Sequence, residues 1–341
     1  MRVQKKNIKN ILFLSLVVLI QASIRPLSAN AQNSWTGPRN VVWESKLKDR
    51  IGFLADSLCQ GRATGTLGGV EASFHIMRIF DKASLTPFDG NYARHVWAGG
   101  GLVGHNIMAM IPGERKHTDK PSRYVIIGSH YDGLGNINGT FYPGADANAS
   151  GVIAMTSLAE MIKARKDLGW SYPYSFIFVA FDAFKQDRAG SKALWQEIET
   201  GQLKDPYTGE IIGPEKIALM VNIDQIGSSL TPVSPERKDY MVVLGNDSIN
   251  PSRRNRLNQC NRFFDIGLEL CYDYYGSRNF TEIFYKLSDQ KVFIEHNIPS
   301  VLFTSGITMN TNRTWDKTES LDLTILKKRI WLIFHWLENV L

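Results

Sequence analysis

The feature that most constrains the fold is the alternation of continuous apolar runs with segments of helical spacing. The apolar runs are rich in Ile, Val and Phe, and their length suits strands that are buried on both faces. Such strands need helices on both sides, so we expect an α/β fold with a mixed, mostly parallel β-sheet covered by helices on both faces. The expected strands are 123–129, 175–181, 217–223, 241–244 and 300–304, and the expected helices are 151–164, 189–199 and 321–341.

Before the first expected strand, the pattern is helical with one irregular interruption. Apolar residues recur at helical spacing over 47–58, and a second helix is expected over 70–83. The glycine-rich stretch 61–69 between them is typical of a loop. The length of 32–341 suits one large α/β domain or two small ones, and we expect a single domain.

The first 31 residues have the pattern of an export signal. A basic start precedes the apolar run 11–20, and Ala29-Asn30-Ala31 forms a small-x-small cleavage site before Gln32. The apolar run is too short to span a membrane. We therefore expect residues 1–31 to be a cleaved signal peptide and the mature protein to be periplasmic or secreted, without a stable membrane anchor. An uncleaved anchor is the alternative.

The charge balance argues against a nucleic-acid partner. The chain has 39 Lys and Arg and 33 Asp and Glu, but five of the basic residues lie in the first 31 positions, which contain no acidic residue. The remaining 34 basic and 33 acidic residues nearly cancel, so the pI near 9.1 indicates no basic binding surface. Cys59, Cys260 and Cys271 are an odd set without a Cys-x-x-Cys pair, and small buried thiols are expected.

Charged residues follow several of the expected strands, where the ligands of α/β proteins usually bind. His130, Asp182 and Asp224 each come directly after an apolar run. His130 with Asp132 has the pattern of a metal-binding imidazole and its supporting carboxylate, although a structural histidine explains this pair, taken alone, better. Asp146, in a loop that opens a helix, is either a further ligand or a loop-fixing carboxylate.

Together with other segments, these residues resemble metallopeptidase family twenty-eight, the co-catalytic di-zinc aminopeptidases. That family also contains glutaminyl cyclases and transferrin-receptor-like members. The resemblance extends from about residue 47 to the C-terminus. Its segments are 54–66, 106–113, 125–133, 144–151, 181–191, 222–227, 288–290 and 303–322.

The resemblance implies a catalytic design with two zinc ions. One zinc is held by a His and an Asp, which here are His130 and Asp224. The other is held by a Glu and a His, a single Asp bridges both ions, and a neighbouring Glu is the general base. Two cations and a carboxylate would together activate one water molecule.

This chain departs from that design at four positions. Ala147 replaces the bridging Asp, Phe184 the general base, Lys185 the ligand Glu and Asn312 the ligand His. Only two zinc ligands remain, whereas catalytic zinc ordinarily keeps three. Lys185 would repel a cation by several kcal/mol at ~4 Å, and we expect it to pair with Asp224 or with Asp146.

Other residues are candidates for a remnant cleft. Phe184 either fills the emptied space or stacks on a ligand. Ser288, Asp289, Gln290, Trp315 and the pair Tyr274-Tyr275 either line the cleft or belong to the core and surface.

Three functions are compatible with the sequence. The leading hypothesis is a non-catalytic or severely impaired pseudo-peptidase that binds a peptide or protein and needs no cofactor. The alternative is a metal-dependent exopeptidase or other amide hydrolase, in which His130, Asp224 and Asp146 form a relocated single-zinc site. The third, an ordinary aminopeptidase with shifted ligands, requires two adjacent Glu residues near 185, and 171–193 contains no Glu.

Overall fold

The computed structural model describes residues 37–114, 122–229, 237, 239–274 and 276–340. The expected signal peptide, its cleavage site and Tyr275 lie outside the described residues. No helix of the described part is long and apolar enough to cross a membrane.

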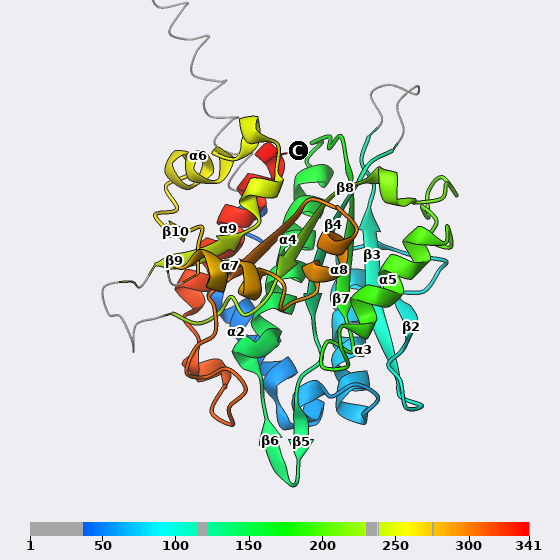
Figure 1. Ribbon diagram of the computed structural model, residues 1–341, viewed down its shortest axis with the longest axis vertical. Coiled ribbons are helices and arrows are strands. Elements are labelled where there is room, and N and C mark those ends of the chain that lie inside the picture. The colour runs from blue at the N-terminus through cyan, green and yellow to red at the C-terminus, as the bar shows by residue number, and fades with distance from the viewer. Residues whose placement is uncertain (1–36, 115–121, 230–236, 238, 275, 341) are drawn as a thin grey trace, which may run out of the picture.

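Nine described strands form one mixed sheet, as the alternation of apolar runs predicts (Figure 1). Its strands are β1 (Thr86–Pro87), β2 (Ala93–Trp97), β3 (Val103–Ile111), β4 (Tyr124–His130), β7 (Ser175–Phe181), β8 (Ile217–Ile223), β9 (Tyr240–Leu244), β10 (Glu269–Cys271) and β11 (Ser300–Thr304). Their order is β1-β3-β7-β4-β8-β11-β9-β10, and β2 pairs with β3 beside β1. The four central strands, β7, β4, β8 and β11, are parallel, so their carboxyl ends meet at one edge. A separate hairpin joins β5 (Gly135–Ile137) and β6 (Thr140–Tyr142).

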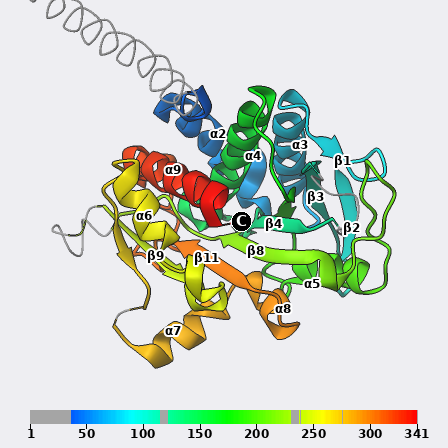
Figure 2. The same ribbon diagram turned by 90° about the horizontal axis from the view of Figure 1, so that it is seen from above.

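Helices cover both faces of the sheet, which explains why the central strands are apolar on both sides. In the view from above, one layer contains α2 (Glu44–Ala55), α3 (Leu67–Lys82), α4 (Gly151–Asp167) and α9 (Leu323–Val340) (Figure 2). The opposite face carries α5 (Ala189–Glu199) and α8 (Gln290–Glu295). The remaining helices are α6 (Arg256–Phe263), which packs on α9, and α7 (Arg278–Tyr285).

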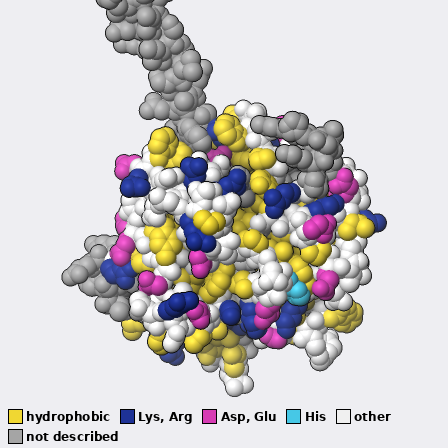
Figure 3. Space-filling view, turned by 45° about the horizontal axis from the view of Figure 1, so that its top comes forward, with side chains coloured by type: hydrophobic (Ala, Val, Ile, Leu, Met, Phe, Trp, Pro, Cys, Tyr) yellow, Lys and Arg dark blue, Asp and Glu magenta, His cyan; other side chains and the backbone are white. Residues whose placement is uncertain are grey.

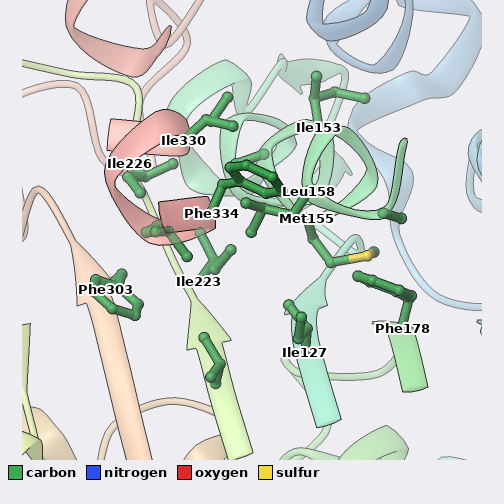
Figure 4. Close-up of a cluster of buried hydrophobic side chains, with 14 of the residues drawn as sticks. Ile127, Ile153, Met155, Leu158, Phe178, Ile223, Ile226, Phe303, Ile330 and Phe334 are labelled. Carbon is green, nitrogen blue, oxygen red and sulfur yellow. The ribbon is translucent and has the colours of Figure 1, made fainter. Parts of the chain in front are cut away.

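The main core lies between the central strands and the helices α4 and α9 (Figure 4). Its side chains interdigitate from both layers, and each is withdrawn from water, which provides the largest favourable contribution to folding. The labelled members are Ile127, Ile153, Met155, Leu158, Phe178, Ile223, Ile226, Phe303, Ile330 and Phe334. At the surface shown in Figure 3, Lys and Arg side chains are interspersed with Asp and Glu, without a large area of one sign.

Two local expectations from the sequence are wrong. The second helix begins at Leu67, so Gly68 and Gly69 belong to it rather than to a loop. Glycine is required there because a Cβ on Gly68 would lie 2.1 Å from the carbonyl oxygen of Cys59. The long strand β3 is not anticipated, because its His, Asn, Met and Ala residues lack the β-branched pattern of a buried strand.

The three cysteines are free thiols. Cys59 and Cys260 are buried, and Cys271 is partly buried with its Sγ 2.7 Å from Nη2 of Arg237. The expectation of small buried thiols therefore holds for two of them.

Candidate functional site

The charged residues that follow the central strands gather at the carboxyl edge of the sheet. His130 is the last residue of β4, and Asp224 comes directly after β8. Because β4 and β8 are parallel neighbours, their ends bring these two side chains together. Asp182 follows β7 on the other side of β4. The parallel order of the strands thus brings His130 and Asp224 together, whereas the carboxylate of Asp182 accepts hydrogen bonds from Thr64, Tyr131 and the N–H of His105.

His130 lies between two carboxylates and is only 2% exposed. Its Nδ1 is 3.1 Å from the carbonyl oxygen and 3.5 Å from Oδ1 of Asp132. Its Nε2 is 3.5 Å from Oδ1 of Asp224. Burial by itself lowers the pKa of His130, but the hydrogen bonds and charges of Asp132 and Asp224 outweigh it and raise the pKa to about 9. Near neutral pH this site therefore contains an imidazolium.

Asp224 is buried beside that imidazolium. Burial by itself raises the pKa of Asp224, whereas the charge and hydrogen bond of His130, with smaller contributions from Ser288 and Lys185, hold the pKa below its usual value. The carboxylate and the imidazolium thus stabilise each other as an ion pair.

Asp132 shapes the segment that contains Phe184 and Lys185. Its Oδ1 accepts a hydrogen bond from the N–H of Phe184 (3.0 Å), and its Oδ2 accepts one from the N–H of Lys185 (3.1 Å). The Phe184 ring stacks on the imidazole of His130, with centroids 4.1 Å apart and planes inclined by 14°. Phe184 therefore packs against the imidazole of His130, which supports a space-filling role.

Lys185 corrects an expectation from the sequence. Its side chain is exposed, and no described carboxylate lies within ion-pair distance of its Nζ, so the expected pair with Asp224 or Asp146 is wrong. The ammonium instead lies 5.0 Å from the centroid of the Phe184 ring. His130 already neutralises Asp224, so a lysine is not needed for that purpose, and water solvates the ammonium at lower cost.

Asp146 fixes a loop. It is fully buried, and its Oδ1 accepts hydrogen bonds from the N–H groups of Gly227 (2.8 Å) and Ser228 (3.2 Å) and from the hydroxyl of Ser150 (3.1 Å). Burial raises the pKa of Asp146 above its usual value. Of the two interpretations from the sequence, this geometry matches the loop-fixing carboxylate.

Ala147, at the expected bridging position, is 8% exposed and presents only a methyl group. Its N–H and that of Asp146 donate to the carboxylate of Asp316, at 3.0 and 2.8 Å.

Asn312 is exposed, with a left-handed φ of 58°. Trp315 is 56% exposed, and its indole lies 5.8 Å from the guanidinium of Arg313. The segment after β11 therefore contributes an aromatic surface but no imidazole.

The segment before α8 is buried beside β8. The Asn222 amide donates to Ser288 Oγ (2.9 Å) and to Gln290 Oε1 (2.7 Å), so these two candidates have structural partners. Asp289 is fully buried, and burial raises its pKa to about 7. Tyr274 is 7% exposed and stacks on Phe284, which matches the core placement considered above.

Sequence reasoning misses the side chain that joins the two halves of the site. Asn148 donates through Nδ2 to the carbonyl oxygens of His130 and Ile223, both at 3.2 Å. Its Oδ1 accepts from the N–H of Gln225 (2.8 Å). Asn148 thereby ties the end of β4 to the end of β8. The one available signal is its place beside Ala147 in a Gly- and Ser-containing loop.

The residues present do not fit a zinc ion. Two ligands about 2.0–2.1 Å from a tetrahedral zinc lie about 3.3 Å apart, so the 3.5 Å between His130 and Asp224 would suit one ion. A third ligand is missing, however. Within the described residues, no group of three or more His, Cys, Asp or Glu side chains is arranged to hold a metal. Asp146, the candidate for a relocated ligand, is used by Gly227 and Ser228.

Comparisons with known proteins agree with the resemblance in the sequence. The family model described as Peptidase family M28 matches residues 106–336. No curated protein matches the chain.

Solved structures share the fold at low sequence identity. The LapA aminopeptidase of Legionella pneumophila is 17% identical with a TM-score of 0.64, covering 90% of this chain and 74% of its own. An aminopeptidase of Aneurinibacillus sp. strain AM-1 is 12% identical with a TM-score of 0.62, and the match covers 90% of this chain and 96% of the aminopeptidase. The glutaminyl cyclase of Porphyromonas gingivalis is 13% identical with a TM-score of 0.60, and the match covers 88% of this chain and 99% of the cyclase.

Proposed function

Because the chain belongs to peptidase family M28, we propose that it is an exported, non-catalytic or severely impaired member that binds a peptide or protein in the remnant of the peptidase cleft. The export part of the proposal comes from the pattern of residues 1–31. The binding part comes from the site described above.

One observation carries the proposal: an internal ion pair and a phenyl ring occupy the region where the family design needs carboxylates. His130 is paired with Asp224 and covered by Phe184. Ala147, at the position expected for the bridging carboxylate, presents only a methyl group. Metal-assisted hydrolysis needs an activated water and a base that accepts its proton, and a phenyl ring at position 184 does neither.

The segment that follows β11 has features that suit binding. Three large apolar side chains are exposed on the segment that follows β11: Ile307 (49%), Met309 (69%) and Trp315 (56%). Aromatic and Met residues at a surface are typical of protein and peptide contacts. The exposed ammonium of Lys185 adds a charge that could pair with a ligand carboxylate.

The proposal is tested by metal content and by hydrolysis. Purified protein, dialysed against micromolar zinc, should hold well under one zinc per chain by elemental analysis. Hydrolysis of leucine 4-nitroanilide should be at the level of a buffer blank, with or without added zinc.

Two results would overturn it in favour of the relocated-zinc enzyme. One is zinc held at one or more ions per chain and lost in His130→Ala. The other is turnover that persists through further purification and disappears in Asp224→Ala. Lys204→Ala is the matched control, since Lys204 is an exposed residue outside the site.

A further inference from the structure

One edge of the main sheet is open at β2. This strand pairs with β3 on one side only, with His95 opposite His105 and Val96 opposite Gly104. In an antiparallel ladder, alternate residues direct their N–H and C=O groups toward the partner strand. The bonds from Met108 N to Tyr92 O (2.7 Å) and from Ala98 N to Leu102 O (3.0 Å) fix that alternation.

His95 and Trp97 therefore direct their backbone groups away from β3. No described residue donates to their carbonyl oxygens or accepts from their N–H groups, which gives two unpaired donors and two unpaired acceptors. The N–H of Ala93 is different, because it donates to the side chain of Asn91 (2.9 Å). The strand also lacks Lys and Pro, the residues that commonly protect an edge from pairing.

A groove runs beside this open edge. It has a volume of about 320 Å³, with His95 and Trp97 on the strand side and α5 on the other. The helix presents two small residues one turn apart, Ala189 and Ala193, so its wall leaves room next to the strand. The side chain of Trp97 is 78% exposed at the end of the groove. In Figure 1, α5 and β2 lie at the same flank of the molecule.

The charges that border the groove are already paired within the protein. Arg94 binds both carboxylate oxygens of Glu197, at 3.4 and 2.5 Å, and so joins β2 to α5. Lys192 pairs with Asp187 at 2.5 Å. Because these charges neutralise each other, the groove favours an uncharged partner. This argues against nucleic acid and against a strongly charged tail.

We propose that this groove binds an extended, uncharged peptide segment that adds to the sheet as a further strand beside β2. The main chain of the segment would form up to four hydrogen bonds with His95 and Trp97, and an apolar side chain would lie beside the Trp97 ring. A second copy of this chain suits the groove less well. A second copy related by a two-fold axis would place its own α5 on the same face of the joined sheet, next to this α5. One extended segment needs only the space of a single strand between β2 and α5.

This site is separate from the remnant cleft. The strand order β4-β7-β3-β2 places the groove three strands from His130, or roughly 14 Å at the usual spacing. The inference therefore does not depend on the proposed function, and either can fail without the other.

The test begins with a phage-displayed library of random dodecapeptides, selected on wild-type protein. Affinities of the selected synthetic peptides are then measured for wild type, His95→Pro and His95→Thr. Proline at 95 removes an N–H that faces away from the sheet, so the β2–β3 ladder is kept while strand addition is blocked. Threonine at 95 loses the same imidazole but keeps the N–H. We expect His95→Pro to weaken binding by about tenfold or more and His95→Thr by less than about threefold.

Hydrogen exchange of the wild-type protein gives a second readout that does not depend on either variant folding. Bound peptide should slow amide exchange in 93–98 and leave 128–132 and 184–188 unchanged. The proposal is overturned if no peptide is selected, if His95→Pro and His95→Thr bind equally, or if protection falls at the remnant cleft. A concentration-dependent dimer that His95→Pro abolishes would also overturn it, since the occupant would then be a second copy.

Discussion

At the scale of single residues, the candidate site is defined by what surrounds His130. Asp132 and Asp224 flank the imidazole, and Phe184 covers one of its faces. All three contacts satisfy or shield a buried charge, which would otherwise be costly. The remnant is therefore a self-contained ion pair that needs no external cation for stability.

This arrangement predicts energetic coupling between His130 and Asp224. His130→Leu leaves Asp224 buried without its counter-charge and should lower the free energy of unfolding by about 3–5 kcal/mol near neutral pH. Asp224→Asn should cost less, because Asp132 still accompanies the imidazolium. The double variant should lose less than the sum of the two single changes, by about 1 kcal/mol or more. Urea unfolding of the four proteins measures the coupling.

Lys185→Met provides the control for that cycle. Because Lys185 is exposed and has no described ion pair, this variant should change stability by no more than about 0.5 kcal/mol. Strictly additive effects of His130→Leu and Asp224→Asn would contradict the ion pair. A large loss of stability in Lys185→Met would instead support the ion pair of Lys185 that the sequence suggested.

Restoring the substituted residues should return zinc before it returns activity. The change combines Ala147→Asp, Phe184→Glu, Lys185→Glu and Asn312→His, and elemental analysis should then find zinc bound to the purified protein. Asn312 has a φ of 58°, a conformation in which both Asn and His are enriched, so the backbone there accepts the new histidine. Leucine 4-nitroanilide hydrolysis should remain low, since catalysis also needs the supporting hydrogen bonds around each ligand. A quadruple variant that folds but binds no zinc would contradict this.

At the scale of elements, buried polar side chains hold together the loops that carry the site. Arg62 is fully buried and donates to four carbonyl oxygens, those of Leu54, Tyr131, Pro143 and Gly144. It thereby connects the end of α2 to the segment after β4 and to the loop before α4. These contacts place Asp132 and Asp146 relative to each other although they belong to different loops.

Arg62→Met should therefore be among the more damaging single changes. Four buried carbonyl groups lose their donor at once, and we expect the free energy of unfolding to fall by about 3–5 kcal/mol. Arg254→Met is the matched control, because Arg254 also donates to two backbone carbonyls but is exposed. That variant should lose at most about 1 kcal/mol. Equal losses in the two denaturant titrations would show that the burial of Arg62 is unimportant.

The contact between α2 and α3 predicts a pH dependence of stability. His75 stacks on Phe53, with centroids 4.1 Å apart, and burial, with the charges of Arg78 and Arg50, lowers its pKa to about 4. The folded pKa lies below the unfolded value near 6.5, so the unfolded chain takes up the proton first. His75 therefore costs no stability above about pH 6.5, and its cost grows as the pH drops toward 4.

His75→Phe should reduce that acid-induced loss by about 1–2 kcal/mol, less than the full shift implies because water screens part of the charge. Thermal or urea unfolding at pH 7 and pH 4.5 compares the two proteins. If both lose the same stability between these pH values, His75 does not contribute.

At the scale of the whole molecule, the peptidase fold is held together by buried apolar side chains that lie apart from the candidate site. The core between the central strands and α4 and α9 does not include His130 or Asp224. The fold thus depends on buried apolar area, whereas the candidate site depends on a few side chains at one edge of the sheet.

We predict that the protein is exported and that its mature form begins at Gln32. The basic start, the apolar run and the Ala29-Asn30-Ala31 site together define the expected cleavage. Mass spectrometry of protein recovered from the periplasm or the medium of a bacterial host would measure the N-terminus directly. Recovery of chains that still begin at Met1 in a membrane fraction would contradict both cleavage and release.

Local patterns in the sequence determined which segments form the central elements. The strands β7, β8 and β11 and the helix α5 have the predicted limits, because hydrophobic periodicity and turn residues act over a few positions. The same local patterns did not predict β2 and β3, because polar residues and a glycine interrupt the alternation or apolar run that is typical of a strand. It also placed the start of α3 three residues late, since the close contact of Gly68 with Cys59 is invisible in sequence.

The sequence by itself determined the order of the strands' polar termini and the uncharged or basic residue types at 147, 184 and 185, because these follow from residue identity alone. Only the tertiary structure decided that His130, rather than Lys185, neutralises Asp224, and that Asp146 is used by Gly227 and Ser228. The physical reason is that a buried charge pairs with whichever partner the packed strand ends bring within reach. That distance depends on strand order and loop conformation, which no local pattern encodes.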